Sequence, residues 1–178
     1  MQVDHLVVGA ADLATGIAWV ADRLGVAPVP GGVHEGVGTR NALLGLGPGQ
    51  YLEVLALDPE QDARIGDLAN TVAMMDDPRL YTLAVASSDL ADSVPMSRLR
   101  TDGILLQWAL SFTHTPLFFI DWMDSPHPST SAGVPDGGRI TSVTVTTPEP
   151  DLLAGVDGIT VREGSWRVEA TIGGVPLA

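Results

Sequence analysis

The sequence predicts an α+β fold built from two similar modules, and three observations support this. The segment over residues 5–14 reappears, as an imperfect repeat, over residues 82–91. Both copies pass from an apolar, strand-like run through small residues to an aspartate that can cap a helix. The chain of 178 residues, 45% of them hydrophobic, is long enough to bury a sizeable core. Because a repeated strand-to-helix unit indicates like modules, we expect a ligand cleft between the two.

The first module is predicted over residues 1–58. Asp12 is suited to cap a helix whose apolar residues recur every three or four positions, and Gly25 stands where that helix ends. A loop rich in glycine and proline surrounds His34. The predicted elements are a strand over 3–9, a helix between Asp12 and Gly25, a short strand over 26–29, and strands over 41–46 and 51–57 joined by a turn over 47–50.

The second module is predicted over residues 80–123, after a linker over 59–79. Its elements follow the same order, although its second strand has no clear position in the sequence. Pro95 is awkward inside the predicted helix, because proline removes a hydrogen bond there. The predicted elements are a strand over 80–86, a helix over 89–99, a strand over 104–111 and a last strand over 116–123.

A β-rich extension is predicted over residues 139–178. The connection that precedes it, over 124–138, is rich in serine, proline, glycine and aspartate. An exposed strand edge in the extension could support a homodimer. Its predicted elements are a strand over 140–146, a helical turn over 151–156, and strands over 159–162 and 166–172.

Composition excludes several classes of function. Nine basic residues, all arginine, stand against 22 acidic residues, and the net charge of -13 would repel a phosphate backbone, so no nucleic acid partner is expected. No apolar run is long enough for a membrane span, and the start of the chain lacks the features of a signal peptide, so the cytoplasm is the expected location. The absence of cysteine excludes disulfides and thiolate chemistry, and no phosphate-binding, dinucleotide-binding or serine-hydrolase motif occurs.

Several segments together resemble the glyoxalase-like domain family of the vicinal oxygen chelate superfamily, which includes glyoxalase I, extradiol dioxygenases and bleomycin-resistance proteins. The resemblance covers most of residues 2–147. It implies paired βαβββ modules that form a curved, cup-like mixed sheet around a small-molecule site, with the helices on the outside. The segments that carry it are Asp4-His5-Leu6-Val7-Val8, residues 31–41, Tyr51-Leu52-Glu53-Val54, Phe118-Phe119-Ile120-Asp121-Trp122 and His127-Pro128.

The resemblance also implies positions for a metal site. In metal-using relatives the ligands come from the first and last strands of each module, which corresponds here to His5, Glu53, Thr82 and Asp121. Threonine is a poor ligand for borderline divalent ions, so His5, Glu53 and Asp121 remain as the candidate ligands of Fe, Mn, Zn, Ni or Co. The alternative is that the cup holds no metal.

Glu53 and His34 are the candidate catalytic residues. A carboxylate between Leu52 and Val54 is costly to bury without a partner, so Glu53 either lines a polar cavity or lies in water on an edge strand. Alternation along the strand places Glu53 on the face of Tyr51, which is the cup interior if the other face packs on helices. His34, in a glycine-rich loop that can approach a ligand closely, is a candidate pocket lid, metal ligand or general base, or an ordinary surface histidine.

Eight further residues are candidates for substrate binding, each with a plainer structural role beside it. The aromatic residues fill a core more often than they stack on a substrate, Arg40 could form a surface salt bridge, and His127 could cap a turn between two prolines. The candidates are Thr39, Arg40, Asn41, Thr82, Trp108, Phe119, Trp122 and His127.

Two functions therefore stay open at the level of sequence. One is a divalent-metal-dependent lyase, isomerase or dioxygenase acting on a small molecule with vicinal oxygens. The other is a metal-free protein of the bleomycin-resistance type that binds or sequesters a small molecule. The replacement of a ligand by Thr82 favours the second function, and the pair His5 and Glu53 favours the first.

Overall fold

The first half of the chain forms four strands and one helix. In the computed structural model, which describes residues 1–62, 67–100 and 102–178, Asp12 caps the helix by accepting a hydrogen bond from the Thr15 amide, and Gly25 ends it in a left-handed conformation. These elements are β1 (Gln2–Ala10), α1 (Leu13–Leu24), β2 (Val29–His34), β3 (Thr39–Gly45) and β4 (Tyr51–Leu57).

Among the described residues, the rest of the chain adds one α-helix, two short 3₁₀ helices and eight strands. No helix within the described part of the chain is long and apolar enough to cross a lipid bilayer. The elements are α2 (Asp67–Ala73), β5 (Arg79–Ala86), β6 (Val94–Leu99), β7 (Leu105–Phe112), β8 (Phe118–Asp121), η1 (Pro128–Thr130), β9 (Ile140–Thr147), η2 (Pro150–Leu153), β10 (Thr160–Glu163), β11 (Arg167–Ile172) and β12 (Val175–Leu177).

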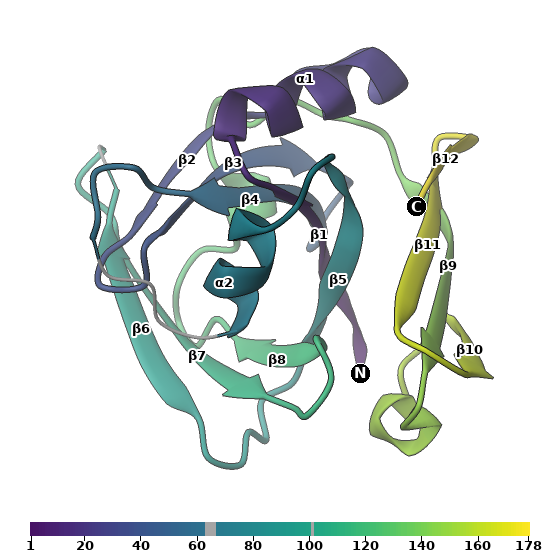
Figure 1. Cartoon of the computed structure of the whole chain (residues 1–178). Coiled ribbons are helices and arrows are strands. Elements are labelled where there is room, and N and C mark those ends of the chain that lie inside the picture. Colours follow the sequence, from purple (N-terminus) through teal and green to yellow (C-terminus); the bar gives the residue numbers. More distant parts are fainter. Residues whose placement is uncertain (63–66, 101) are drawn as a thin grey trace.

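The eight strands β1–β8 form one strongly curved sheet in the order β2-β3-β4-β1-β5-β8-β7-β6 (Figure 1). The order is symmetric about the β1/β5 pair, because β1 is parallel to β4 in the first half and β5 is parallel to β8 in the second. The predicted α+β fold with two like modules is therefore confirmed. Strands β9 to β12 form a separate sheet in the order β10-β9-β11-β12.

The predicted helix over 89–99 is wrong, because β6 occupies residues 94–99 and pairs with β7. Proline inside a helix leaves a carbonyl without its donor, whereas at the edge of a sheet its missing N–H costs little. β6 is an edge strand, and Pro95 lies there opposite Ala109. The glycine- and proline-rich segment before His34 likewise forms edge strand β2 rather than a loop.

The two faces of the curved sheet are covered differently. Helix α1 lies on the convex face, as predicted, but α2, which falls within the predicted linker, packs on the concave face through Val72 and Met75 (Figure 1). Gly9 makes this packing close, because a Cβ at this position would lie 2.6 Å from the Met75 sulfur. The expectation that the helices lie outside is thus correct for α1 only.

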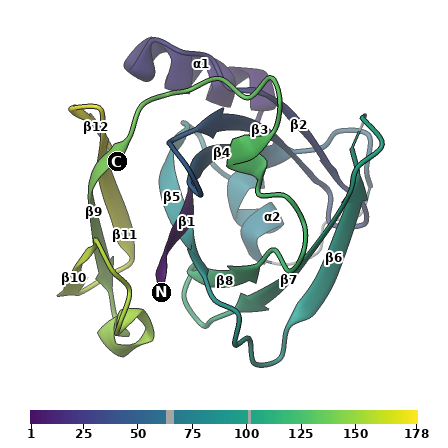
Figure 2. The same cartoon turned by 180° about the vertical axis from the view of Figure 1, so that it is seen from behind.

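The small C-terminal sheet packs on the convex side of β1 and β5 (Figures 1 and 2). Val145, Val168 and Ile172 belong to the same buried cluster as Leu83 and Val85 of β5. The second module has no helix at the place that corresponds to α1. The extension therefore covers the apolar face that such a helix would bury.

Candidate functional site

A bulge in β1 places two ionisable side chains at the centre of the concave face. The register between β1 and β5 shifts between Val3 and His5, and such a bulge can turn neighbouring side chains toward the same site. Asp4 and His5 are both buried, and the His5 Nδ1 atom lies 2.7 Å from Asp4 Oδ1. The imidazole stacks on the ring of Tyr51, with 4.4 Å between the ring centroids.

Asp4 is held as a carboxylate by three side chains. His5 and His127 each place a ring nitrogen on its oxygens, and Trp122 Nε1 donates to Oδ2 at 3.1 Å. Burial alone would raise the pKa of Asp4, but the hydrogen bonds and charges of His127 and His5 outweigh it and lower the pKa to about 2. A carboxylate only accepts hydrogen bonds, so His5 Nδ1 donates to it.

The other ring nitrogen of His5 faces Glu53 on the central strand β4. His5 Nε2 lies 3.7 Å from Glu53 Oε2, and Asn41 Nδ2 donates to Glu53 Oε1 at 2.6 Å. Because β4 lies between β3 and β1, the alternative of an edge strand with Glu53 in water is wrong. The hydrogen bond from Asn41 offsets part of the free-energy cost of burying this carboxylate.

His34 approaches Glu53 from the edge strand β2. Its Nε2 atom lies 4.0 Å from Glu53 Oε1 and 3.3 Å from Asn41 Nδ2, and its Nδ1 atom contacts the Thr39 hydroxyl at 2.9 Å. Burial lowers the pKa of His34, the positive charge of Arg98 lowers it further, and Glu53 acts in the opposite direction. The ring is therefore neutral at pH 7 and can accept a proton.

Aromatic side chains of the second half face this polar group. Trp108 and Trp122 lie with their ring centroids 5.5 Å apart, and Phe118 meets the His5 ring edge to face at 5.6 Å. Phe119, which was predicted to bind substrate, packs against the convex cluster instead, because alternation along β8 turns Phe118 and not Phe119 inward.

Two of the predicted metal-site positions do not join His5 and Glu53. Asp121 lies on the face of Phe119, away from Ile120 and the concave cluster, and its Oδ1 accepts a hydrogen bond from the Met123 amide at 2.8 Å. Thr82 is fully buried, and its hydroxyl donates to the Pro116 carbonyl at 2.8 Å.

The donor set does not fit a metal centre with three protein ligands. The predicted set is not assembled, since it includes Asp121. Within the part of the chain that the structure describes, no group of three or more histidine, aspartate and glutamate side chains is placed to hold an ion. The chemistry available at this site is therefore that of its side chains.

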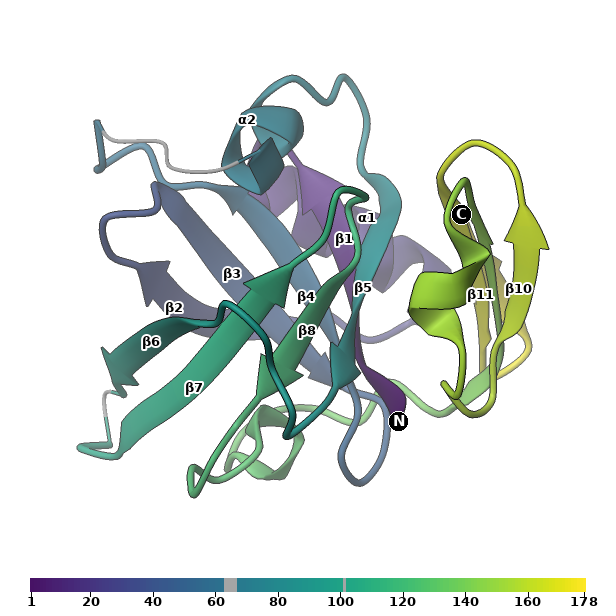
Figure 3. The same cartoon turned by 90° about the horizontal axis from the view of Figure 1, so that it is seen from below.

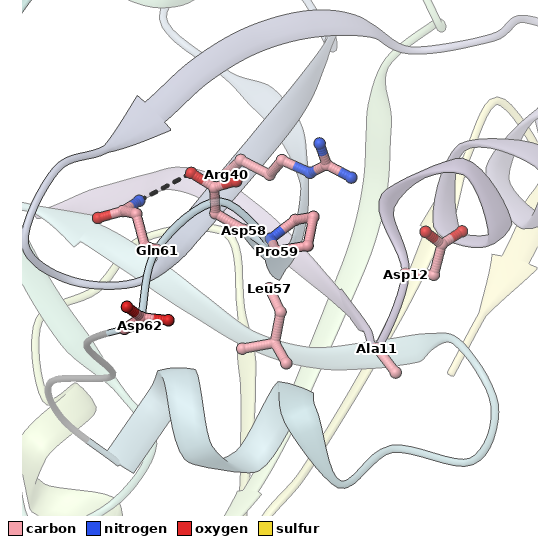
Figure 4. Close-up of a pocket in the computed structure, with 8 residues that line it drawn as sticks. All are labelled: Ala11, Asp12, Arg40, Leu57, Asp58, Pro59, Gln61 and Asp62. Carbon is pink, nitrogen blue, oxygen red and sulfur yellow. Dashed lines mark hydrogen bonds between the residues drawn. The ribbon is translucent and has the colours of Figure 1, made fainter.

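Arg40 also lies away from the concave centre. Because it neighbours Asn41 in β3, its side chain points to the opposite face. It lines a separate hollow of about 350 Å³ together with Asp12, Asp58 and Asp62 (Figure 4). Figure 4 shows the Arg40 guanidinium extending away from the hydrogen bond between Gln61 and Asp58.

Two charged residues of the site were not predicted. Asp4 had a signal in the sequence, since it is a second ionisable side chain directly before His5 in an apolar strand. Arg98 had none, because the segment around it was predicted as a helix.

The model of the family described as "Glyoxalase-like domain" matches residues 3–156. No curated protein sequence matches the chain significantly. Methylmalonyl-CoA epimerase from Mycobacterium tuberculosis has a similar solved structure, at 20% identity and TM-score 0.46, covering 67% of this chain and 86% of the epimerase. A variant of methylmalonyl-CoA epimerase from Streptomyces coelicolor matches at 16% identity and TM-score 0.47, covering 72% of this chain and 99% of that protein.

A variant of 4-hydroxymandelate synthase from Streptomyces coelicolor matches over a longer part of the chain. It is 14% identical with a TM-score of 0.51, and the match covers 98% of this chain and 61% of the synthase. At this identity the likeness concerns the fold alone.

Proposed function

This chain belongs to the glyoxalase-like domain family of the vicinal oxygen chelate superfamily, and on that premise we propose that its concave face binds an oxygen-rich small molecule and exchanges a proton with it through Glu53. The observation that carries the proposal is the buried carboxylate of Glu53, which is held between His5 and Asn41 on a central strand. The reaction type is therefore an isomerisation or a related proton transfer next to a carbonyl group.

The two oxygens of Glu53 have different roles in this proposal. Oε1 is held by Asn41 at 2.6 Å, which orients the carboxylate. Oε2 lies 3.7 Å from His5 Nε2, beyond hydrogen-bond distance, so it is the oxygen that can accept a substrate proton. The C–H bond of the substrate breaks, the O–H bond forms on Oε2, and the electron pair moves onto the substrate carbonyl oxygen as an enolate.

His5 and Asp4 act as positioning residues. The carboxylate of Asp4 holds the proton on His5 Nδ1 and so fixes the imidazole ring beside Glu53, with Nε2 3.7 Å from Oε2. Removal of Asp4 would release the imidazole to rotate and to change tautomer.

A second candidate function is binding without chemistry. It is favoured by the aromatic side chains on the second half of the concave face, Trp108, Phe118 and Trp122, which suit an apolar ring of a ligand. In this case the polar group orients the ligand, and Glu53 accepts hydrogen bonds only. The two functions differ in whether the bound molecule exchanges hydrogen with solvent.

The experiment is deuterium exchange. The protein is incubated in D₂O with lactaldehyde, dihydroxyacetone, acetoin, lactate and 2-oxobutanoate, and loss of the proton next to the carbonyl group is followed by NMR. We expect exchange of at least one compound, reduced by about 100-fold or more in Glu53→Gln, because a positioned acid or base contributes about 10² to 10⁴. Glu163→Gln, on an exposed residue of β10, is the matched control and should exchange as the unmodified protein does.

Two outcomes would contradict the proposal. Exchange that is equal in the unmodified protein and Glu53→Gln would exclude Glu53 as the proton acceptor, and binding without any exchange would favour the second function. Protein purified without an affinity tag and treated with a chelator should keep its exchange activity. If the chelator abolishes exchange and an added divalent metal restores it, the result would support the metal-dependent function that the resemblance implies. Cytoplasmic location and a homodimer stay predictions.

A further inference from the structure

The edge strands of the curved sheet meet at a seam that Arg98 crosses. β2 and β6 are the two ends of the sheet, and its curvature brings them near each other (Figure 3). The side chain of Arg98, on β6, lies directly against Gly32 on β2. A Cβ at Gly32 would lie 2.7 Å from Arg98 Nη1 and 2.9 Å from its Cδ, so the glycine lets the guanidinium lie directly against β2.

Two guanidinium nitrogens of the partly buried Arg98 have no acceptor. Among the described residues, neither its Nε nor its Nη1 has a hydrogen-bond partner, although both atoms are shielded from water. The Oδ1 atom of Asn41 is also buried without a partner and lies against Gly31, the neighbour of Gly32 on β2, whereas the remaining such atom, Arg40 Nε, lies away from this seam. Buried polar atoms without partners are costly and uncommon, so their gathering at one place indicates that another molecule completes them.

A cavity lies next to these atoms. It has a volume of about 130 Å³, and its lining includes Arg98, Gly31, Leu43 and Leu106. Leu106 belongs to the concave cluster of the proposed site, and Leu43 lies on β3, two residues after Asn41. The cavity thus leads from the seam toward the concave face, and its volume admits only a small molecule.

The charges around Arg98 connect the cavity to the proposed site. Burial lowers the pKa of Arg98, while the nearby carboxylate of Glu53 acts in the opposite direction. Arg98 in turn lowers the pKa of His34. A molecule bound at Arg98 therefore lies within the electric field of both residues that can accept its proton.

We propose that Arg98 binds the carboxylate of the ligand, so that the substrates are small 2-hydroxy or 2-oxo monocarboxylates. The planar fork of a guanidinium matches the two oxygens of a carboxylate, and the chain's net charge of -13 makes a local cation necessary to attract an anion. The inference rests on the proposed function, because Glu53 takes the proton from C2 of a 2-hydroxy acid or from C3 of a 2-oxo acid. The C–H electron pair moves onto the carboxylate oxygens in the first case and onto the 2-oxo oxygen in the second.

The experiment measures thermal stability with matched pairs of probes. Formate, acetate, glycolate and lactate are compared with formamide, acetamide, glycolamide and lactamide at equal concentration and ionic strength. At least one carboxylate should raise the melting temperature by about 2 °C more than its amide does, since a ligand that binds the native state stabilises it. Arg98→Gln should lose this difference, and Arg98→Lys should keep less than half of it.

Arg167→Gln is the matched control, because Arg167 lies on the exposed face of β11 and pairs with Glu169. It should respond to each carboxylate as the unmodified protein does. Circular dichroism and the indole N–H NMR signal of Trp122 report whether Arg98→Gln keeps the fold and the Asp4 group. Equal stabilisation by carboxylate and amide, or an undiminished difference in Arg98→Gln, would overturn the inference.

The deuterium experiment separates this inference from the proposed function. If acetoin or dihydroxyacetone exchanges through Glu53 while carboxylates show no preference for Arg98, the proposed function stands and the inference is wrong. If Arg98→Gln removes carboxylate binding but Glu53→Gln leaves all exchange unchanged, the anion site stands without the proton transfer.

Discussion

The two halves of the large sheet have the same strand order but contribute different side chains to the concave face. The first half supplies the ionisable and amide groups of His5, His34, Asn41 and Glu53. The second half supplies Trp108, Phe118 and Trp122, and the cation of Arg98. The duplicated backbone thus builds the concave face, and the positions at which the copies differ determine its chemistry.

The halves differ again on the convex face. The first half is covered by α1, which approaches β4 so closely that a Cβ on Gly16 would lie 2.5 Å from Val54 Cγ1. The second half is covered by the C-terminal sheet, through residues such as Val168 and Ile172. An apolar sheet face must be removed from water, and this chain meets the same requirement with a helix on one half and a sheet on the other.

The largest loss of stability is expected from a substitution in the C-terminal sheet, which covers the second half of the large sheet. Ile172→Ala removes a side chain that is 1% exposed between the two sheets, and we expect a loss of about 3 kcal/mol in the free energy of unfolding. Denaturant unfolding measures it. The control is Ile104→Ala, on a residue that is 40% exposed, which should lose less than about 1 kcal/mol. Equal losses would mean that the C-terminal sheet is not part of the core.

The matching test on the first half adds volume. Gly16→Val forces a side chain into the contact between α1 and β4, and overpacking of this kind should cost about 2 kcal/mol. Ala18→Val, on an exposed residue of the same helix, separates this effect from the lower helix propensity of valine. If both variants unfold at the same denaturant concentration, the helix does not pack as closely as the distance implies.

The buried carboxylate of Asp4, in the first half, should make the free energy of unfolding depend on pH. The pKa of Asp4 is about 2 in the fold, against 3.8 for the free side chain, so it contributes about 2 kcal/mol. The unfolded chain binds the proton first as pH falls, so this contribution is complete above pH 4 and is lost between about pH 4 and pH 2.

Asp4→Asn should therefore be less stable at neutral pH and should have a flatter stability curve in this acid range. Unfolding free energies at several pH values measure the difference between the two proteins. Asp22→Asn, on an exposed residue of α1, should follow the unmodified curve. The same slope in all three proteins would show that Asp4 is not held as a carboxylate.

The smallest effect concerns a single hydrogen bond between the C-terminal sheet and the large sheet. The indole of Trp166 donates to the Tyr81 carbonyl at 2.8 Å. Trp166→Phe keeps most of the ring and removes the donor, so we expect a loss of about 1 kcal/mol. Denaturant unfolding measures it, and a loss as large as that of Ile172→Ala would show that ring packing, rather than the hydrogen bond, dominates this contact.

Much of this arrangement could be predicted from the sequence. The repeat predicted two modules, and alternation along residues 51–57 placed Glu53 on the face opposite Leu52 and Val54, as observed. Pro95 disfavours a helix, but the repeat predicts one over the same residues. The segment instead forms β6, so neither this strand nor the place of Arg98 on it could be predicted.

The sequence by itself determined the plan of two like modules through its repeat, and the face of Glu53 through a local period of two residues. Only the tertiary structure decided which ionisable groups meet. Asp4 turns inward through a bulge, Asp121 turns outward through its place in β8, and Arg98 lies against Gly32 because the sheet curls until its edge strands approach. Curvature and register depend on contacts between residues far apart in the chain, and no local pattern records them.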